Sequence, residues 1–403
     1  MVEMTTKTPG KILTREFMIA SAIGFLICIN FFTLMATIPG YVLDVFHFDE
    51  MQAGFATGVF VLGMMFSRLF AGGLVSRIGF RPMLFMGLTG LVLSSVGYFF
   101  ATDPVTFLII RVLTGFFHGM TATTCITLVT TITPPERSGE SVGYYSMCQM
   151  FAWAIGPYVG VEFLRAGNYT GIFVFCTVLL AASLLFVPFL RLKGGPFTAT
   201  RARQGRDGEA GGAKGRWWEK FIEPKVLPAA AVCFFLFLFN SAVMSFMALY
   251  SETIGLAQAA SVFFLVYVAS LLLTRPFVSR LFDRKGYAYI LYPGALLNIV
   301  SLLLLSRLHT APMLFLSAVL FGVGFGAQQN AAAALAVKLT PRHRMGIGNA
   351  TYYLVLDGVS SIGPVVAGAL IPLIGYRGMY MTGSIYVAAG ISLFYMLFGR
   401  KLR

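Results

Sequence analysis

The sequence predicts an all-α membrane protein with twelve transmembrane helices in two pseudo-symmetric six-helix bundles. Hydrophobic residues make up 57% of the 403 residues, only 11% are charged, and the mean hydropathy is +0.80. A water-soluble domain carries about 25% charged residues, so lipid must solvate much of this surface. Two further observations complete the prediction: long apolar segments follow one another along the chain, and its two halves repeat each other.

The apolar segments are long enough to be membrane spans. About twenty apolar residues cross the hydrocarbon core as a helix, and lipid offers no partner for an unpaired backbone amide. We expect the spans near residues 17–41, 51–75, 83–101, 104–131, 142–164, 170–190, 227–250, 259–281, 287–306, 311–337, 346–374 and 379–399. The first segment lacks a small-residue cleavage site, so no cleavable signal peptide is expected.

Basic residues predict the orientation of the loops. The termini and the even-numbered loops are rich in lysine and arginine, whereas the odd-numbered loops hold only Arg165, Arg307 and Arg377. Since cytoplasmic loops carry the excess of basic residues, we expect both termini in the cytoplasm and the protein in the cytoplasmic (inner) membrane. This distribution also accounts for the net charge of +14 without a nucleic-acid partner.

Residues 192–226 are the predicted linker between an N-terminal bundle, residues 1–191, and a C-terminal bundle, residues 227–403. The linker is glycine-rich, basic and poor in large apolar side chains, so it should be solvated. Near its end, Trp217 and Trp218 stand beside charged residues. We expect a short interfacial helix there, with binding of a partner protein as the alternative.

The halves superpose without a gap when the sequence is shifted by 207 positions, which carries Gly115 onto Gly322. The same shift matches Arg68 with Arg275, Gly79 with Gly286, Gly119 with Gly326, Thr133-Pro134 with Thr340-Pro341, Tyr145 with Tyr352 and Gly156-Pro157 with Gly363-Pro364. So many matches in one register indicate a duplicated six-helix unit. Duplicated units of this kind place a substrate site between the halves near the middle of the membrane.

A glycine-bearing loop, GGLVSRIGFR at residues 72–81, joins the second and third spans. The candidate residues of this loop and of its second copy are Gly72, Arg77, Gly79, Arg81, Asp283, Arg284 and Gly286. A short glycine turn lets two helices approach closely, and an acid beside it can meet a helix N-terminus or an arginine of the other half. The alternative is a simple positively charged loop.

The fourth span contains Arg111, Gly115 and His118, which share one helical face. An arginine within an apolar helix is costly, so it should face a cavity or a partner. We expect Arg111 to act in proton coupling or substrate contact, with snorkelling to the outer interface beside Asp103 as the alternative. His118 is either a proton carrier or a packing histidine.

The fifth span carries Gly156-Pro157-Tyr158-Val159-Gly160, in which Gly156, Pro157 and Gly160 are the candidate residues. The proline should kink this helix, and the glycines beside it should allow tight packing on a neighbouring span. Such a helix can set which conformation is stable when no substrate is bound.

Over residues 17–400 these motifs resemble the major facilitator superfamily and, within it, the drug/proton antiporters. The resemblance implies that the loop at residues 72–81 latches the outward-open state. Ser76 stands where the family usually has aspartate, whereas the second copy keeps Asp283, which leaves the N-terminal latch in question. The resemblance further links the span 4 arginine to proton coupling and the span 5 motif to export.

Asp357 is the clearest acid in the middle of a predicted span. Burial disfavours the charged form of a carboxyl group, so such a residue can exchange a proton near neutral pH. The alternative is a structural pair with a neighbouring arginine or hydroxyl. The first span offers no comparable acid until Asp44 at its outer end, so coupling there is not expected.

By analogy with the superfamily, spans 1, 4, 7 and 10 should line the substrate site. Their candidate polar residues are Asn30, Thr33, Thr37, Thr121, Asn240, Gln328, Gln329 and Asn330. Among many phenylalanine and methionine side chains, these few polar groups suit a small amphipathic molecule.

We therefore expect a proton-coupled exporter of small amphipathic organic compounds that works by alternating access. Its expected partners are a small-molecule substrate, protons and the lipid bilayer, and we expect a monomer. The alternatives are an exporter of one metabolite, including a metal-chelating one, a proton symporter for uptake, and a membrane receptor that transports nothing. No enzyme motif, cofactor motif or metal-ligand spacing is present, and the five cysteines lie in apolar runs.

Overall fold

The computed structural model describes residues 13–133, 137–191, 223–285, 288–340 and 345–398, and these residues form helices and connecting turns without a strand. The long helices are α1 (Arg15–Phe46), α2 (Glu50–Ile78), α3 (Phe80–Gly97), α4 (Pro104–Ile132), α5 (Ser138–Arg165), α6 (Tyr169–Phe186), α8 (Leu227–Thr253), α9 (Ala257–Lys285), α10 (Ala288–Ser306), α11 (Ala311–Leu339) and α12 (Met345–Phe398). Short 3₁₀ turns lie at Tyr98–Phe100, Val187–Phe189 and Pro224–Val226.

The helices reproduce the twelve predicted crossings. Ten stretches of the described chain are long and apolar enough to span a membrane, the last one covering Leu354–Met396. That stretch holds two crossings, because Gly375 has φ 69° and ψ 172° and breaks α12. α5 adds the twelfth; its 28 residues suffice in length although it is less apolar. The predicted fold is therefore confirmed.

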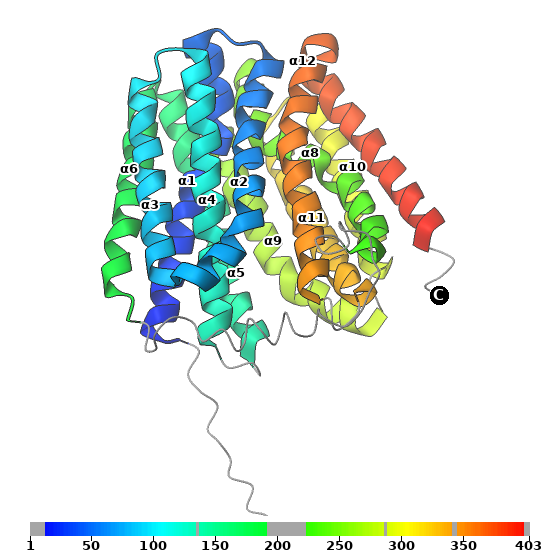
Figure 1. Ribbon diagram of the computed structural model, residues 1–403. Coiled ribbons are helices and arrows are strands. Elements are labelled where there is room, and N and C mark those ends of the chain that lie inside the picture. Colours follow the sequence, from blue (N-terminus) through cyan, green and yellow to red (C-terminus); the bar gives the residue numbers. More distant parts are fainter. Residues whose placement is uncertain (1–12, 134–136, 192–222, 286–287, 341–344, 399–403) are drawn as a thin grey trace, which may run out of the picture.

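Polar caps fix several helix ends. Asp49 accepts a hydrogen bond from the Gln52 amide at 2.7 Å at the start of α2. Asp103 accepts one from the Thr106 amide at 2.9 Å at the start of α4, and these hydrogen bonds lower the pKa of the Asp103 carboxyl. Both caps satisfy amide groups that a first helical turn leaves unpaired. They lie at what we term the distal end, where residues 47–49 and 101–103 connect helices; the opposite, terminal end is where α1 begins and α12 ends (Figure 1).

α1–α6 and α8–α12 form two bundles that stand side by side (Figure 1). Equivalent contacts in the two bundles confirm the repeat register. A Cβ atom added to Gly115 would lie 1.9 Å from the Phe60 carbonyl oxygen, and one added to Gly322 would lie 2.3 Å from that of Tyr267. Since the same shift carries Phe60 onto Tyr267, α2–α4 and α9–α11 pack in the same way. The domain boundaries at residues 191 and 227 stay a prediction, and Trp217 and Trp218 lie outside the described residues.

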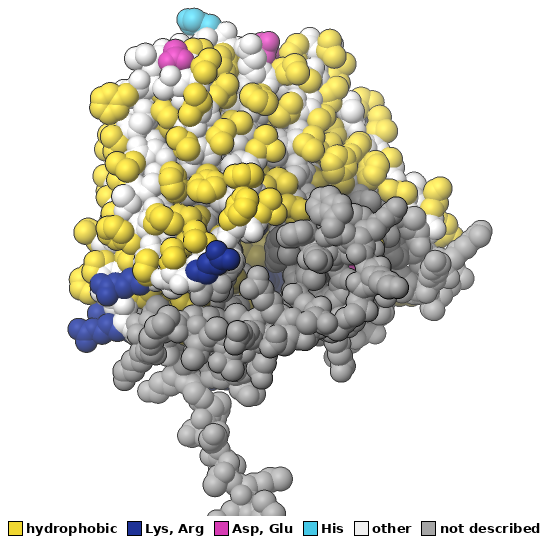
Figure 2. All heavy atoms as spheres, viewed as in Figure 1, with side chains coloured by type: hydrophobic (Ala, Val, Ile, Leu, Met, Phe, Trp, Pro, Cys, Tyr) yellow, Lys and Arg dark blue, Asp and Glu magenta, His cyan; other side chains and the backbone are white. Residues whose placement is uncertain are grey.

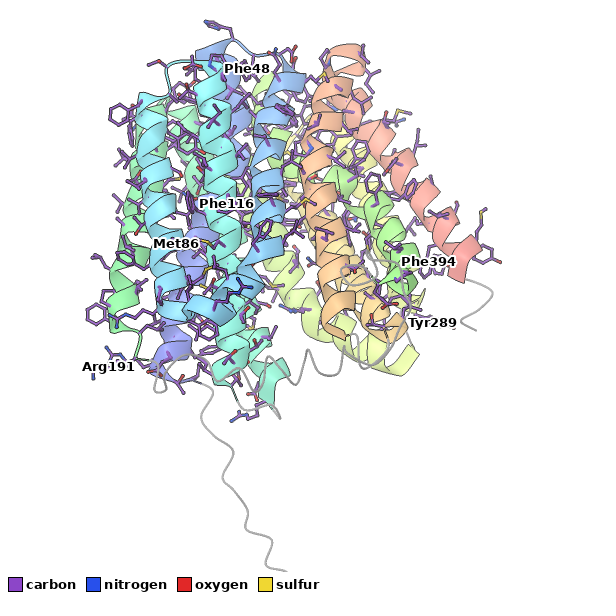
Figure 3. All side chains as sticks on the ribbon, viewed as in Figure 1. Phe48, Met86, Phe116, Arg191, Tyr289 and Phe394 are labelled. Carbon is purple, nitrogen blue, oxygen red and sulfur yellow. The ribbon has the colours of Figure 1, made fainter. Side chains whose placement is uncertain are left out.

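The outer wall of the molecule is apolar. Figure 2 shows hydrophobic side chains over most of the visible wall, with acidic side chains at the distal end and basic ones toward the terminal end. Leu93 and Leu273, for example, are 66% and 72% exposed. In Figure 3, Met86 lies along this wall, between Phe48 at the distal end and Arg191 at the terminal end. A wall of this kind is suited to lipid rather than to water.

The two bundles meet closely at the distal end. A Cβ atom on Gly54 would lie 2.1 Å from the Pro364 carbonyl oxygen, and one on Gly368 would lie 2.1 Å from that of Glu50. Toward the terminal end α2 and α12 diverge (Figure 1), and the nearest atom to a Cβ on Gly358 is Met65 Cε at 3.9 Å. The interface is therefore closed by backbone contact at its distal end and is looser toward the terminal end.

Candidate functional site

An ion pair joins the bundles where they diverge. Arg68 Nη1, on α2, lies 2.7 Å from Asp357 Oδ2, on α12, and the two side chains are 33% and 14% exposed. The contact is a close approach of charges rather than an aligned hydrogen bond. The other donors of Arg68 are poorly used: Nη2 contacts Met64 Sδ at 3.7 Å, and Nε is buried without a partner. The predicted acid thus faces an arginine of the opposite bundle.

The repeat places a different contact at the equivalent position. The 207-residue shift carries Arg68 onto Arg275 and Met150 onto Asp357. Arg275 Nη1, on α9, lies 3.1 Å from Met150 Sδ, on α5. Both arginines therefore reach from one bundle to the other, but a carboxylate receives one and a thioether receives the other. The two contacts are equivalent in the repeat, but one contains an acidic residue and the other contains a methionine.

Arg111 lies inside the N-terminal bundle, with 2% of its surface exposed. Its Nε donates to the Ala56 carbonyl at 3.0 Å, and the guanidinium carbon lies 4.9 Å from the centre of the Phe60 ring. Nη2 approaches the Thr57 carbonyl at 3.5 Å, and Nη1 is buried without a partner. The charge is therefore held inside the bundle by carbonyl dipoles of α2, and a role of Arg111 in proton coupling or substrate contact stays a prediction.

His118 shares the face of α4 that carries Arg111, because both side chains contact Phe60. The histidine ring lies 5.4 Å from the rings of both Phe31 and Phe60 and is 4% exposed. Its Nδ1 atom is buried without a hydrogen-bond partner. The His118 ring is therefore packed among aromatic side chains, with one nitrogen that makes no hydrogen bond. A role of His118 in proton coupling stays a prediction.

A row of aromatic side chains crosses the interface between the bundles. Phe31 contacts Phe32 with ring centres 4.7 Å apart, and Phe32 contacts Trp153 of α5 at 5.2 Å. Trp153 then meets Phe325 of α11 at 6.3 Å, and Phe325 meets Phe237 of α8 at 5.1 Å. We call these five residues the aromatic row. Its rings join the two bundles through apolar contacts, and those of Phe237 and Phe325 are buried.

The candidate residues of α1 face the interior of their own bundle. Asn30 is fully buried and neither amide atom has a hydrogen-bond partner among the described residues. Thr33 donates to the Gly156 carbonyl at 3.0 Å, and Thr37 donates to the Thr33 carbonyl at 2.9 Å. Thr33 thus holds α1 against α5, whereas the Thr37 hydroxyl bonds within α1, and both hydroxyl groups are already used.

The candidates on α4 and α11 are also internal. Thr121 donates to the Phe117 carbonyl at 2.8 Å, and its hydroxyl lies against Gly87 of α3. Gln328 is fully buried, and its Oε1 accepts from Asn298 Nδ2 of α10 at 2.8 Å. Under the repeat Thr121 matches Gln328, so both bundles use this position to join neighbouring helices.

The remaining candidates that the structure describes are less deeply buried. Asn240 of α8 is half-buried, with its Oδ1 atom buried and unpaired among the described residues. Gln329 is half-buried, and its main-chain oxygen accepts from the Tyr352 hydroxyl at 3.4 Å. The side chain of Asn330 is outside the described part of the structure. Substrate contact by any of these residues stays a prediction.

The span 5 motif packs as its composition predicts. A Cβ atom on Gly156 would lie 2.9 Å from the Ile29 carbonyl oxygen, and one on Gly160 would lie 2.8 Å from Thr37 Cγ2. Pro157 lies within α5 between them. The glycines therefore bring α5 into close contact with α1.

The loop motif is described only in part. Gly79 has φ +89° and makes the tight turn between α2 and α3, and Arg81 Nη2 donates to the Pro188 carbonyl at 3.5 Å. Arg77 is exposed. The side chains of Ser76, Asp283 and Arg284 and all of Gly286 lie outside what the structure describes, so the latch stays a prediction.

Sequence reasoning missed Arg68 and Trp153 as site residues. In the sequence, Arg68 was noted only because it matches Arg275 in the repeat. Charge balance could have indicated it, because an acid and an arginine in the middle of membrane spans each need a partner. Trp153 carried no such signal. Among the described residues no three His, Cys, Asp or Glu side chains gather as a metal site, and the five cysteines are unpaired.

Comparison with known proteins identifies the family to which these features belong. The profile of the Major Facilitator Superfamily matches residues 20–362 and 259–403. The uncharacterized MFS-type transporter MJ1560 of Methanocaldococcus jannaschii is 24% identical over 379 residues, covering 91% of this chain and 96% of that protein. The multi-drug resistance efflux pump PmrA of Streptococcus pneumoniae is 22% identical over 83% of each chain. A crystal structure of a D-xylose-proton symporter superposes with a TM-score of 0.73 at 15% identity, covering 94% of this chain and 96% of that one.

Proposed function

Because the chain belongs to the Major Facilitator Superfamily, we propose that it exports small amphipathic organic compounds in exchange for protons, by alternating access in the cytoplasmic membrane. The bundles would rock about the closed distal contacts, and the site between them would open to either side in turn. The terminal end would be the cytoplasmic one, as the basic loops indicate, so the conformation described would face the cytoplasm.

The observation that carries this proposal is the Arg68–Asp357 pair at the looser part of the interface. A carboxylate that joins two moving bundles couples protonation to movement, because a neutral carboxyl group attracts Arg68 far less. A proton taken up by Asp357 would weaken the tie between α2 and α12. Its release would restore that tie.

Two further features favour export. The span 5 glycines pack α5 against α1, as expected for a helix that biases the conformational equilibrium. The relative named as a multi-drug efflux pump matches most of the chain, although at only 22% identity.

The test is proton movement in inverted vesicles that contain the purified full-length protein. Aromatic sulfonates, quaternary ammonium ions, aromatic amino acids and neutral alcohols are added as probes. The uptake of each probe and the internal pH of the vesicles are measured at the same time. We expect one class to enter as protons leave, and Asp357→Asn to abolish both movements. Asp103→Asn, which alters an exposed helix-capping acid instead, is the matched control and should behave as wild type.

Two results would contradict the proposal. Probe uptake without proton movement would show a carrier of another coupling type. Full proton exchange by Asp357→Asn would remove Asp357 from coupling and leave the Arg68 pair a structural contact.

A further inference from the structure

The ion pair between the bundles indicates the charge of the transported compound. We propose that the substrate is a zwitterion with an apolar body: its acidic group binds Arg68, its basic group binds Asp357, and its body lies on the half-buried rings of the aromatic row. This inference rests on the proposed exchange with protons and names the substrate class of the same site. Three features of the interface support it.

The first feature is that Arg68 and Asp357 depend on each other for charge. Arg68 Nη1 lies 2.7 Å from Asp357 Oδ2, and neither side chain has a second ion pair among the described residues. Breaking such a pair from one side leaves a charge without a partner, which is costly in a region of low dielectric constant. A ligand that carries both charges avoids this cost, because it gives each side chain a new partner.

The second feature is unused binding capacity at the pair. A guanidinium can bind a carboxylate through two parallel hydrogen bonds, but the contact with Asp357 is not an aligned hydrogen bond, and Arg68 Nε is buried without a partner. The two side chains are 33% and 14% exposed. Space remains beside them, since the nearest atom to a Cβ added to Gly358 is Met65 Cε at 3.9 Å. A ligand that reaches the pair could therefore make the hydrogen bonds that the two residues do not make with each other.

The third feature is the apolar surface that begins next to Arg68. Arg68 Nη2 lies 3.7 Å from Met64 Sδ, and Met64 belongs to an apolar cluster against which Phe31 packs. Phe31 is the first member of the aromatic row, which continues through Phe32 to Trp153. These three rings are only half-buried. A molecule with its charged groups at the ion pair could therefore lay an apolar body against them.

Ions of a single charge fit exchange with protons less well. An anion would bind Arg68 best when Asp357 is protonated, so it would move together with the proton. A cation would share one carboxylate with Arg68 and leave a net positive charge in the interface. A zwitterion needs Asp357 in its charged form. The proton and the zwitterion therefore exclude each other at Asp357, which is the condition for exchange.

The binding experiment uses four probes of similar body: 2-amino-6-phenylhexanoate as the zwitterion, 5-phenylpentan-1-amine as the cation, 6-phenylhexanoate as the anion and 5-phenylpentan-1-ol as the neutral compound. Binding to the purified full-length protein in detergent is measured by calorimetry at neutral pH. We expect the zwitterion to bind at least about tenfold tighter than the other three, as one additional charge-assisted contact provides. Its binding should weaken as the pH falls, because a protonated Asp357 no longer attracts the ammonium group.

Variants then separate the two charged groups. Asp357→Asn leaves Arg68 without its acid, so the anion should bind about as tightly as the zwitterion. Arg68→Gln leaves Asp357 without its arginine, so the cation should match the zwitterion. The double variant leaves neither charge unpaired, so it should fold, and it should bind the four probes without preference for charge. Trp153→Leu should weaken all four probes, and Arg191→Gln, at an exposed arginine, is the control that should behave as wild type.

Transport provides a second readout. Exchange of a zwitterion for a proton moves one positive charge per cycle, whereas exchange of a monovalent cation for a proton moves none. In the inverted vesicles protons leave as the substrate enters, so an inside-positive membrane potential should raise the amount of zwitterion that accumulates.

The outcomes that overturn this inference differ from those that overturn the proposed exchange. Tighter binding of the cation, the anion or the alcohol than of the zwitterion would overturn the substrate class, and so would an undiminished preference for the zwitterion in the double variant. Selective binding and uptake of the zwitterion that respond neither to pH nor to the membrane potential would instead support the substrate class and contradict the exchange with protons.

Discussion

At the scale of single residues, the Arg68–Asp357 pair is costly to break from one side. Removing one charge leaves the other in the interface without a partner, whereas removing both leaves two neutral amides of similar shape. The pair is partly exposed on the arginine side, at 33%, so the penalty falls below that of a fully buried pair.

We expect Arg68→Gln and Asp357→Asn each to lower the stability by about 1–2 kcal/mol. The double variant should lose less than the sum of the two. Thermal unfolding of the three variants in detergent measures the coupling. Additive losses would show that the charges do not interact.

Gly115 provides a second prediction at this scale. A methyl group there would lie 1.9 Å from the Phe60 carbonyl oxygen, so α2 and α4 would have to separate. Gly115→Ala should therefore cost about 1–3 kcal/mol, the range of an overpacked core. Gly143→Ala is the matched control, since nothing lies within 4 Å of its added Cβ. Equal unfolding temperatures for both variants would contradict the close packing of α2 on α4.

At the scale of helices, the sequence predicted the elements, whereas the partners of their polar side chains are known only from the structure. Apolar length predicted all twelve crossings, and the repeat predicted that Gly115 and Gly322 make equivalent contacts. Hydropathy does not distinguish a side chain that faces its own bundle from one that faces the interface. Thr33 and Gln328 illustrate this, because both are predicted as substrate contacts and both bind neighbouring helices. The pairing of Arg68 with Asp357 depends on how two distant helices meet, which one sequence does not determine.

The unequal pairs on α2–α12 and α5–α9 suggest a third prediction. Met150→Glu would give Arg275 a carboxylate where it now meets a thioether at 3.1 Å. A cross-bundle ion pair at this position should stabilise the conformation described. The accessibility of a cysteine introduced at the distal end should therefore fall, and transport should slow severalfold. Met150→Gln is the neutral control. Unchanged accessibility in Met150→Glu would show that Arg275 does not turn to the new acid.

At the scale of the whole molecule, closure of the distal end is the main property of this conformation. Backbone contacts close α2 against α12, and Ser261 donates to Glu162 Oε1 at 2.6 Å between α9 and α5. Both sides of the interface are thus held at the same end. Transport by rocking requires these contacts to open.

A cross-link between positions 162 and 261 should therefore stop transport. In a background without the five native cysteines, Glu162→Cys/Ser261→Cys would be treated with a short bifunctional thiol reagent that a reducing agent cleaves. We expect transport to be lost on treatment and to return on reduction, whereas each single-cysteine variant should stay active. Full transport by the cross-linked protein would show that these helices need not separate.

The distal closure also determines how the conformational equilibrium can be altered. Gly54 and Gly368 lie against bare backbone, and so does Gly58, whose added Cβ would fall 2.3 Å from the Ser361 carbonyl oxygen. The closest atoms there are backbone carbonyl groups, so a single methyl group would disfavour this conformation and favour the one that is open at the distal end. The Gly58→Ala variant could then populate the conformation with an open distal end sufficiently for its structure to be determined. The glycines that allow this close contact are thus also the positions at which one added methyl group should most strongly change the equilibrium between the two conformations.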